Sequence, residues 1–218
     1  EGMKVNIVNN YYKPGPATPN NRVKYRIAGI GVRTTQYVTG RGGRPNVWKP
    51  MEHVWGRYYV DGNIVEGNEE VTKDNWTKGI YEQIDNDQND HTFTEQVKKD
   101  IRLDAPLETD VITTHTAGEA YRLVLQYAGC SKHRDSIDER IVEEVRCGTA
   151  TYYGSVTPDA KTKPGLIDLP DDVKPAGASS AWPALSDGGI SPEMLKDSDG
   201  DGIPDRWEKE NNLNPQDK

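Results

Sequence analysis

Five carboxylates fall within twelve residues of the segment KDSDGDGIPDRWEKE. Asp197, Asp199 and Asp201 occupy alternate positions, and Asp205 and Glu208 follow at wider intervals. A hard divalent cation such as Ca²⁺ takes six to eight oxygen ligands, and a chain can wrap one when carboxylates recur at every second residue. The spacing therefore predicts a calcium-binding loop, and an acidic solvated turn is the alternative.

The loop has the spacing of an EF-hand, in which carboxylates occupy positions 1, 3, 5, 9 and 12. Gly202 would make the sharp turn, the carbonyl of Ile203 would fill position 7, and Glu208 would close the site with both oxygens. The helices expected on either side are residues 191–195 and 205–211. They are shorter than those of a sensor EF-hand, so residues 191–218 should form a structural clip of a secreted, periplasmic or cell-surface protein.

Basic residues are concentrated in the first quarter of the chain. Residues 1–60 hold ten Lys/Arg and two Asp/Glu, whereas the remaining residues hold 17 and 33. This asymmetry predicts a local anionic partner, with a solvated basic face as the alternative. Arginine pairs bidentately with carboxylates, which makes basic side chains suitable ligands for such a partner. The candidate binding residues are Lys13, Arg26, Arg33, Arg44, Lys49, His53 and Arg57.

The composition and the alternation of residue types indicate a chain with more strand than helix. Hydrophobic residues make up 33% of the sequence, with 21 Gly and 14 Pro, and no apolar run is long enough to span a membrane. Strands are expected within residues 1–12, 25–38 and 53–65. Residues 8–12 align with residues 61–65, and the alignment places Asn10 on Asn63. A repeated bend asparagine is typical of a parallel β-solenoid, although two unrelated turns would give the same pattern.

Two helices are expected in the middle of the chain. Thr116 with Glu119 forms a capping box ahead of an amphipathic run that ends at Gly129. A second helix begins at Asp135 or Ser136 and ends at Gly148, which gives an αα-hairpin within residues 116–153. Cys130 would lie at the turn and Cys147 roughly 16 Å away along a helix. A disulfide needs Cα atoms within about 7 Å, so we expect two unpaired cysteines.

Residues 154–190 contain Pro, Gly, Ala and Ser without a periodic pattern. We expect them to form an extended tail on the surface, anchored by Trp182 and Leu185. Residues 1–115 would then hold the β rungs and their long loops.

Residues 134–149 have the sequence RDSIDERIVEEVRCGT. This segment resembles, nearly position for position, the pattern R-D-x-x-D-x-R-I-V-x-x-V-R-x-G-T of the pectate lyases of the right-handed parallel β-helix type. Residues 5–12, VNIVNNYY, are similar to the family's V-x-V-x-N-N-Y-Y rung. Residues 126–130, QYAGC, look like the end of the preceding helix in that family.

The resemblance implies a mainly β fold: the C-terminal rungs of a right-handed parallel β-helix, with a short αα-hairpin and an extended C-terminal tail. It also implies calcium-assisted β-elimination on polygalacturonate or a related uronan, with an arginine as the base. The family's catalytic arginine and calcium-binding aspartates precede the N-N-Y-Y rung, so no catalytic residue is assigned in this chain. We therefore expect the C-terminal part of a lyase, inactive alone, whose partners are an acidic polysaccharide and its own N-terminal half.

Two other functions compete with the lyase. A non-catalytic secreted glycan-binding module with a structural calcium site would keep the same surface and the same loop. A glycoside hydrolase would need paired acids, and residues 1–60 hold too few of them.

Overall fold

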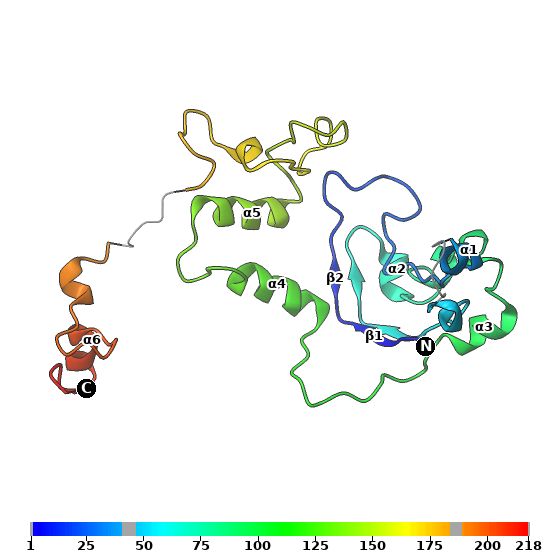
Figure 1. Cartoon of the computed structure of the whole chain (residues 1–218), viewed down its shortest axis with the longest axis horizontal. Coiled ribbons are helices and arrows are strands. Elements are labelled where there is room, and N and C mark those ends of the chain that lie inside the picture. The colour runs from blue at the N-terminus through cyan, green and yellow to red at the C-terminus, as the bar shows by residue number, and fades with distance from the viewer. Residues whose placement is uncertain (1, 41–46, 184–188, 218) are drawn as a thin grey trace.

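A computed structural model describes residues 2–40, 47–183 and 189–217 of the chain. Its strands form two short parallel pairs (Figure 1). Strand β1 (Lys4–Val8) pairs with β3 (Arg57–Asp61), and β2 (Tyr11–Tyr12) pairs with β4 (Ile64–Val65). Val8 lies opposite Asp61, and Tyr11 lies opposite Ile64. The chain therefore turns the same corner twice in one register, and the alignment of residues 8–12 with 61–65 is confirmed.

A ladder of asparagine amides holds this corner. The backbone N–H and the Nδ2 of Asn10 both donate to Oδ1 of Asn63, at 3.0 and 2.9 Å. The backbone N–H of Asn63 donates in turn to Oδ1 of Asn75 at 2.8 Å. Nδ2 of Asn63 donates to the carbonyl of Ile7 at 2.8 Å, and Asn63 is 1% exposed. The amide thus satisfies backbone groups that a tight corner would otherwise leave unpaired.

The hydrophobic core lies between these strands and residues 66–103. Its buried members are Ile27, Ile30, Val65, Val71, Trp76, Ile80, Phe93 and Ile101. The helices of this region are α2 (Glu69–Lys73), η2 (Tyr81–Gln83), η3 (Asp87–Asn89) and α3 (Glu95–Asp100). After α3 the chain runs beside β3, where the N–H of Tyr58 donates to the carbonyl of Ile101 at 2.7 Å. Residues with an irregular, polar sequence therefore supply much of the core.

The two predicted helices are present. Helix α4 (Ala117–Tyr127) begins with the Thr116–Glu119 capping box. Helix α5 (Ser136–Cys147) ends at Gly148, whose φ of +67° is the left-handed conformation that glycine adopts at low cost. Arg134 joins the two helices, because its guanidinium donates to carbonyls at the end of α4, including that of Leu125 at 2.8 Å. Cys130 and Cys147 are both free, as expected, and both are exposed.

A cluster of polar and aromatic side chains attaches α4 to the strand region. The rings of Tyr11 and Tyr121 stack with centroids 4.4 Å apart. Glu66 accepts hydrogen bonds from the Tyr11 hydroxyl at 2.7 Å and from Nζ of Lys13 at 2.6 Å. The hydrogen bond to the Glu66 carboxylate, with burial, raises the pKa of Tyr11 to about 12. Tyr11 therefore stays a neutral donor across the whole physiological range.

The C-terminal third of the described chain contains short helices. They are η4 (Pro170–Val173), η5 (Pro192–Leu195) and α6 (Asp205–Glu210). Residues 154–183 follow α5 and fold back beside it (Figure 1). Ala181, at 4% exposed, is buried there, whereas its neighbour Trp182 is 70% exposed. Leu185, the other predicted anchor, lies outside the described residues.

The prediction of a mainly β right-handed parallel β-helix is wrong for this chain. In the described ranges, strands cover only the four short segments above, and helices cover more residues. Residues 25–38, expected as strands, contribute one isolated bridge at Arg33 and the start of α1 (Thr35–Thr39). The backbone N–H of Val32 donates to Oδ1 of Asn89 at 2.8 Å, so a side chain satisfies a group that a sheet would pair.

One further element completes the described structure. The 3-10 helix η1 (Lys49–Met51) lies between α1 and β3. Among the helices of the described residues, none is long and apolar enough to cross a membrane.

We predict that Asn63→Ala lowers the free energy of unfolding by about 2–3 kcal/mol, because the buried groups that bond to its amide lose their partners. Equilibrium urea unfolding measures this change. The exposed Asn20 supplies a control, since Asn20→Ala should leave the midpoint unchanged. Equal midpoints for the wild type and Asn63→Ala would contradict the importance of the ladder.

Candidate functional site

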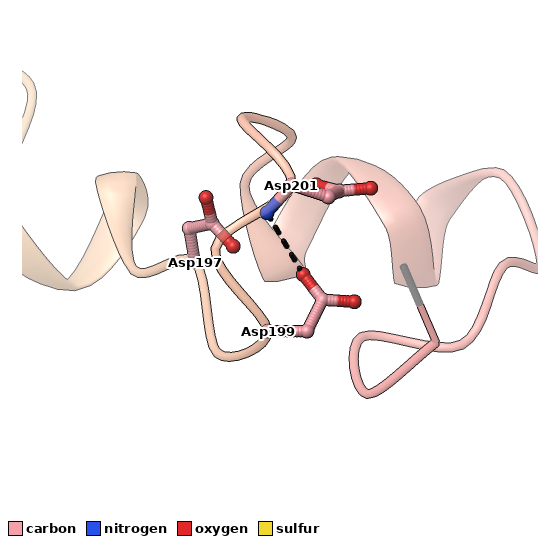
Figure 2. A group of neighbouring side chains, drawn as sticks. All are labelled: Asp197, Asp199 and Asp201. Carbon is pink, nitrogen blue, oxygen red and sulfur yellow. Dashed lines mark hydrogen bonds between the residues drawn. The ribbon is translucent and has the colours of Figure 1, made fainter.

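The acidic segment folds into a loop that gathers carboxylates. One carboxylate oxygen from each of Asp197, Asp199 and Asp201 lies within 4.8 Å of the other two (Figure 2). The loop follows η5 and leads directly into α6, so the predicted flanking helices are confirmed at both ends. Three like charges at this separation repel one another, and a cation among them would relieve the repulsion.

Backbone N–H groups fix the loop in this shape. Asp197 accepts from the N–H of Gly200 at 2.7 Å and from that of Gly202 at 2.9 Å. The N–H of Gly202, followed by other backbone donors, holds the pKa of Asp197 below its usual value. The φ of Gly202 is +94°, so only a glycine makes this turn without strain. Asp199 accepts from the N–H of Asp201 at 3.2 Å, which is the dashed line in Figure 2.

Two carboxylate oxygens of the loop are buried without a hydrogen-bond partner among the described residues. They are Oδ2 of Asp199 and Oε2 of Glu208. Glu208 is 2% exposed, and burial, together with the charges of Asp199 and its neighbours, raises its pKa above the usual value. Burial likewise raises the pKa of Asp199. Buried, unpaired anionic oxygens are what a calcium site offers before the cation enters, so the residues fit Ca²⁺.

Asp205, like Asp197, is held by hydrogen bonds from the loop itself. It accepts from the N–H of Ser198 at 2.6 Å and from the Ser198 hydroxyl at 2.7 Å. These bonds, the hydroxyl first, lower the pKa of Asp205. Asp205 therefore closes the loop through Ser198, and direct ligation by Asp205 or by the carbonyl of Ile203 stays a prediction. The contribution of Ser198 was missed, and only its place between two of the acids hinted at it.

Three of the candidate basic residues lie together near α1 and η1. The guanidinium of Arg33 lies over the rings of Tyr37 and Trp48, 4.9 and 4.5 Å from their centroids. Lys49 follows Trp48 directly, and the backbone N–H of His53 donates to the carbonyl of Arg33 at 3.0 Å. We call Arg33, Tyr37, Trp48, Lys49 and His53 the Arg33 cluster. Tyr37 was not predicted, although its position four residues after Arg33 would have allowed the contact.

Acidic residues balance two members of this cluster. Lys49 forms an ion pair with Glu52. Nε2 of His53 lies 2.7 Å from Oδ2 of Asp90, and the same oxygen accepts from the N–H of Thr35 at 2.6 Å. The hydrogen bond from His53 is the main cause that lowers the pKa of Asp90, so this carboxylate is ionised at neutral pH. The positive charge that no acidic residue balances in the Arg33 cluster therefore lies chiefly on Arg33.

The structure does not bring Lys13, Arg26 or Arg57 into this cluster. Nζ of Lys13 is paired with Glu66, and Nε of Arg57 donates to the carbonyl of Asp100 at 3.0 Å. Arg26 lines a separate cavity of about 220 Å³. Arg44 lies outside the described residues. Substrate contact by these residues stays a prediction.

We predict that, without divalent cations, Glu208→Gln makes the loop more stable at neutral pH than the wild type. The pKa of Glu208 is raised in the folded state, so ionisation favours unfolding, and protonation removes this effect. The difference between variant and wild type should therefore shrink as the pH falls toward 4.5, the ordinary pKa of the group. Hydrogen exchange at the Gly202 and Leu213 amides, which bond to Asp197 and to the Glu208 carbonyl, measures it.

Glu210→Gln supplies the control, because Glu210 is an exposed acid on the same helix. It should leave the exchange of both amides unchanged. A destabilised Glu208→Gln loop in the metal-free protein would contradict a buried, unpaired charge at this position.

Comparison with known proteins finds relatives for about half of the chain. No family model matches it. "Probable pectate lyase C" of Aspergillus fumigatus is 35% identical over 105 residues, which is 48% of this chain and 20% of the relative. The protein of the same name from Aspergillus terreus is 39% identical over 100 residues, 46% of this chain and 19% of the relative. The chain thus spans about a fifth of the length of these curated relatives, and part of it is similar in sequence to fungal proteins named as pectate lyases.

Proposed function

We propose that this chain is part of a pectate lyase-type enzyme that acts on polygalacturonate or a related uronan by β-elimination. Within it, the chain would supply a polymer-binding surface and a structural calcium site in the loop of residues 197–208, which we call the calcium clip. The observation that carries the proposal is the similarity of about 100 residues to proteins named as pectate lyases. Residues 191–218, with their calcium clip, would place the protein outside the cell or in the periplasm, where calcium is abundant enough for weak sites.

The reaction sets the requirements for such an enzyme. A base removes the proton α to the uronate carboxylate, a double bond forms in the ring, and the bond to the 4-O breaks. Negative charge builds up on the carboxylate in the transition state, so cationic groups near it lower the barrier. The Arg33 cluster would bind and orient carboxylates of the polymer. No residue of this chain is assigned as the base.

Arg33 suits this binding for a geometric reason. The rings of Tyr37 and Trp48 hold its guanidinium, so little side-chain freedom is lost when a ligand binds. Within the described residues, no carboxylate forms an ion pair with Arg33, in contrast to Lys49. The planar guanidinium can therefore pair with a uronate carboxylate.

The calcium clip would be formed by Asp197, Asp199, Asp201 and Glu208. Bound Ca²⁺ would neutralise the mutual repulsion of these carboxylates. The protein's contribution is to hold them in place through the N–H groups of the loop and through Asp205. Because Glu208 lies on α6, closure of the site would also fix this helix to the loop.

We predict that the chain binds one Ca²⁺ and that Glu208→Gln weakens the binding at least about tenfold, because ligand charge sets calcium affinity. Isothermal titration calorimetry with CaCl₂ measures it. Glu210→Gln, which removes an equal charge outside the loop, should bind as the wild type does. Equal calcium affinities for Glu208→Gln and the wild type would exclude Glu208 as a ligand.

We predict that the chain binds polygalacturonate and that Arg33→Ala weakens the binding about tenfold, the value of one charge-assisted pair. Electrophoresis in gels that contain polygalacturonate measures it. Arg122→Ala is the matched control, because Arg122 is an exposed arginine on α4 whose guanidinium contacts Gln126. Equal losses for the two variants would show non-specific attraction and contradict the Arg33 site.

Ultraviolet absorbance of the unsaturated ends follows the lyase reaction itself. This chain alone, with calcium and polygalacturonate, should bind without releasing unsaturated product. Release of unsaturated product by this chain alone would contradict the proposal that the catalytic base lies outside it. The natural gene product should release unsaturated ends. If that protein binds the polymer but releases no unsaturated ends, its function is that of a non-catalytic glycan-binding module and the lyase proposal is wrong.

A further inference from the structure

A cavity of about 620 Å³ lies between α5 and the segment that folds back beside it. Both its walls come from the part of the chain that follows α4, so it is remote from the Arg33 cluster beside α1 (Figure 1). The polar and aromatic residues that line it are Ser136, Arg140, Tyr152, Ser179, Ser180 and Trp182. Its volume is in the range of pockets that bind small organic ligands.

The charge of this cavity is balanced within the protein. NH1 of Arg140 lies 2.7 Å from Oε2 of Glu144, and both side chains are largely shielded from solvent. The guanidinium also lies over the ring of Tyr152, 5.0 Å from its centroid. Oε1 of Glu144 accepts from the N–H of Thr151 at 2.9 Å. An anionic ligand would have to compete with Glu144 for Arg140, so an uncharged ligand fits better.

Trp182 gives the cavity an aromatic platform. The side chain is 70% exposed, although its neighbour Ala181 is buried at 4%. The backbone N–H of Trp182 donates to Oγ of Ser180 at 3.0 Å, which fixes the backbone of the residue at the rim. Because the backbone holds Trp182 at the rim, most of the indole is exposed to solvent. A flat, partly apolar ligand can cover this apolar area.

A second cavity of about 420 Å³ adjoins the first and shares Ile137, Arg140 and Trp182 with it. Its other lining residues include Ile141, Ile167 and Leu169, so it is mainly apolar. The two cavities together form a groove with a polar end and an apolar end around Trp182. Pyranose rings have the same division, because their hydroxyls point outward at the edge and their C–H groups form apolar faces.

We propose that this groove is a saccharide-binding site for an uncharged pyranose unit, which is either a neutral hexose or a methyl-esterified uronate. The ring would stack on Trp182, and its hydroxyls would bond to Ser136, Ser179 and Ser180. The site is distinct from the Arg33 cluster in both place and charge. It does not require that the chain belong to a lyase, since binding of an uncharged sugar involves none of the residues of the Arg33 cluster.

Calorimetric titration of the whole chain with two probes tests this site: β-1,4-linked galactan oligosaccharides and fully methyl-esterified galacturonate oligosaccharides. Binding of either probe is expected, and the probe that binds identifies the source of the uncharged ring. Trp182→Ala should weaken it at least about tenfold, since the stacking platform is removed. Trp207→Ala is the matched control, because Trp207 is an exposed tryptophan on α6.

The two proposed sugar sites are distinguished by testing each variant with the ligand of the other site. Arg33→Ala should leave the affinity for the uncharged probes unchanged, and Trp182→Ala should leave the affinity for polygalacturonate unchanged. Failure of both uncharged probes to bind at millimolar concentration would overturn the proposal. So would equal losses for Trp182→Ala and Trp207→Ala, or displacement of the uncharged probes by unesterified oligogalacturonate.

Discussion

The buried amide of Asn63 determines how the N-terminal half of the chain is arranged. It accepts from Asn10, its Nδ2 donates to the carbonyl of Ile7, and its backbone N–H donates to Asn75. Asn63, through its side chain and its backbone N–H, thus joins two passes of the chain and the segment after α2. Because the register of β1 and β3 follows from this corner, so does the position of Tyr11, on which α4 packs.

The two candidate sites differ in the sign of their charge and in whether that charge is balanced within the protein. The loop at residues 197–208 concentrates negative charge and buries part of it, which raises the pKa values of Asp199 and Glu208. That arrangement costs free energy, which a bound cation would offset. The Arg33 cluster, by contrast, balances Lys49 and His53 with acids and holds Arg33 with aromatic rings. The donor set of the first site suits a small hard cation, and the exposed guanidinium of the second suits a planar anion.

The predicted strands of residues 25–38 show where reasoning from alternation fails. The pattern of apolar residues in this segment fits a strand. However, the backbone N–H of Val32 donates to the side chain of Asn89, and that of Tyr37 donates to the side chain of Thr34. These bonds take the place of a sheet ladder and lead into α1. A side chain 57 residues away cannot be read from local periodicity, so the expected number of strands was too high and the fold class was wrong.

The sequence by itself determined the features that depend on neighbouring residues. These include the capped helices α4 and α5, the acidic loop with its glycine turn, and, through a repeated bend, the pairing of Asn10 with Asn63. Tertiary structure alone decided that Glu208 is buried, that Tyr37 and Trp48 enclose Arg33, and that Trp182 stands at the rim of a groove. The physical reason is that caps and turns are satisfied within a few residues, whereas burial and ring contacts depend on segments that meet only in the folded chain.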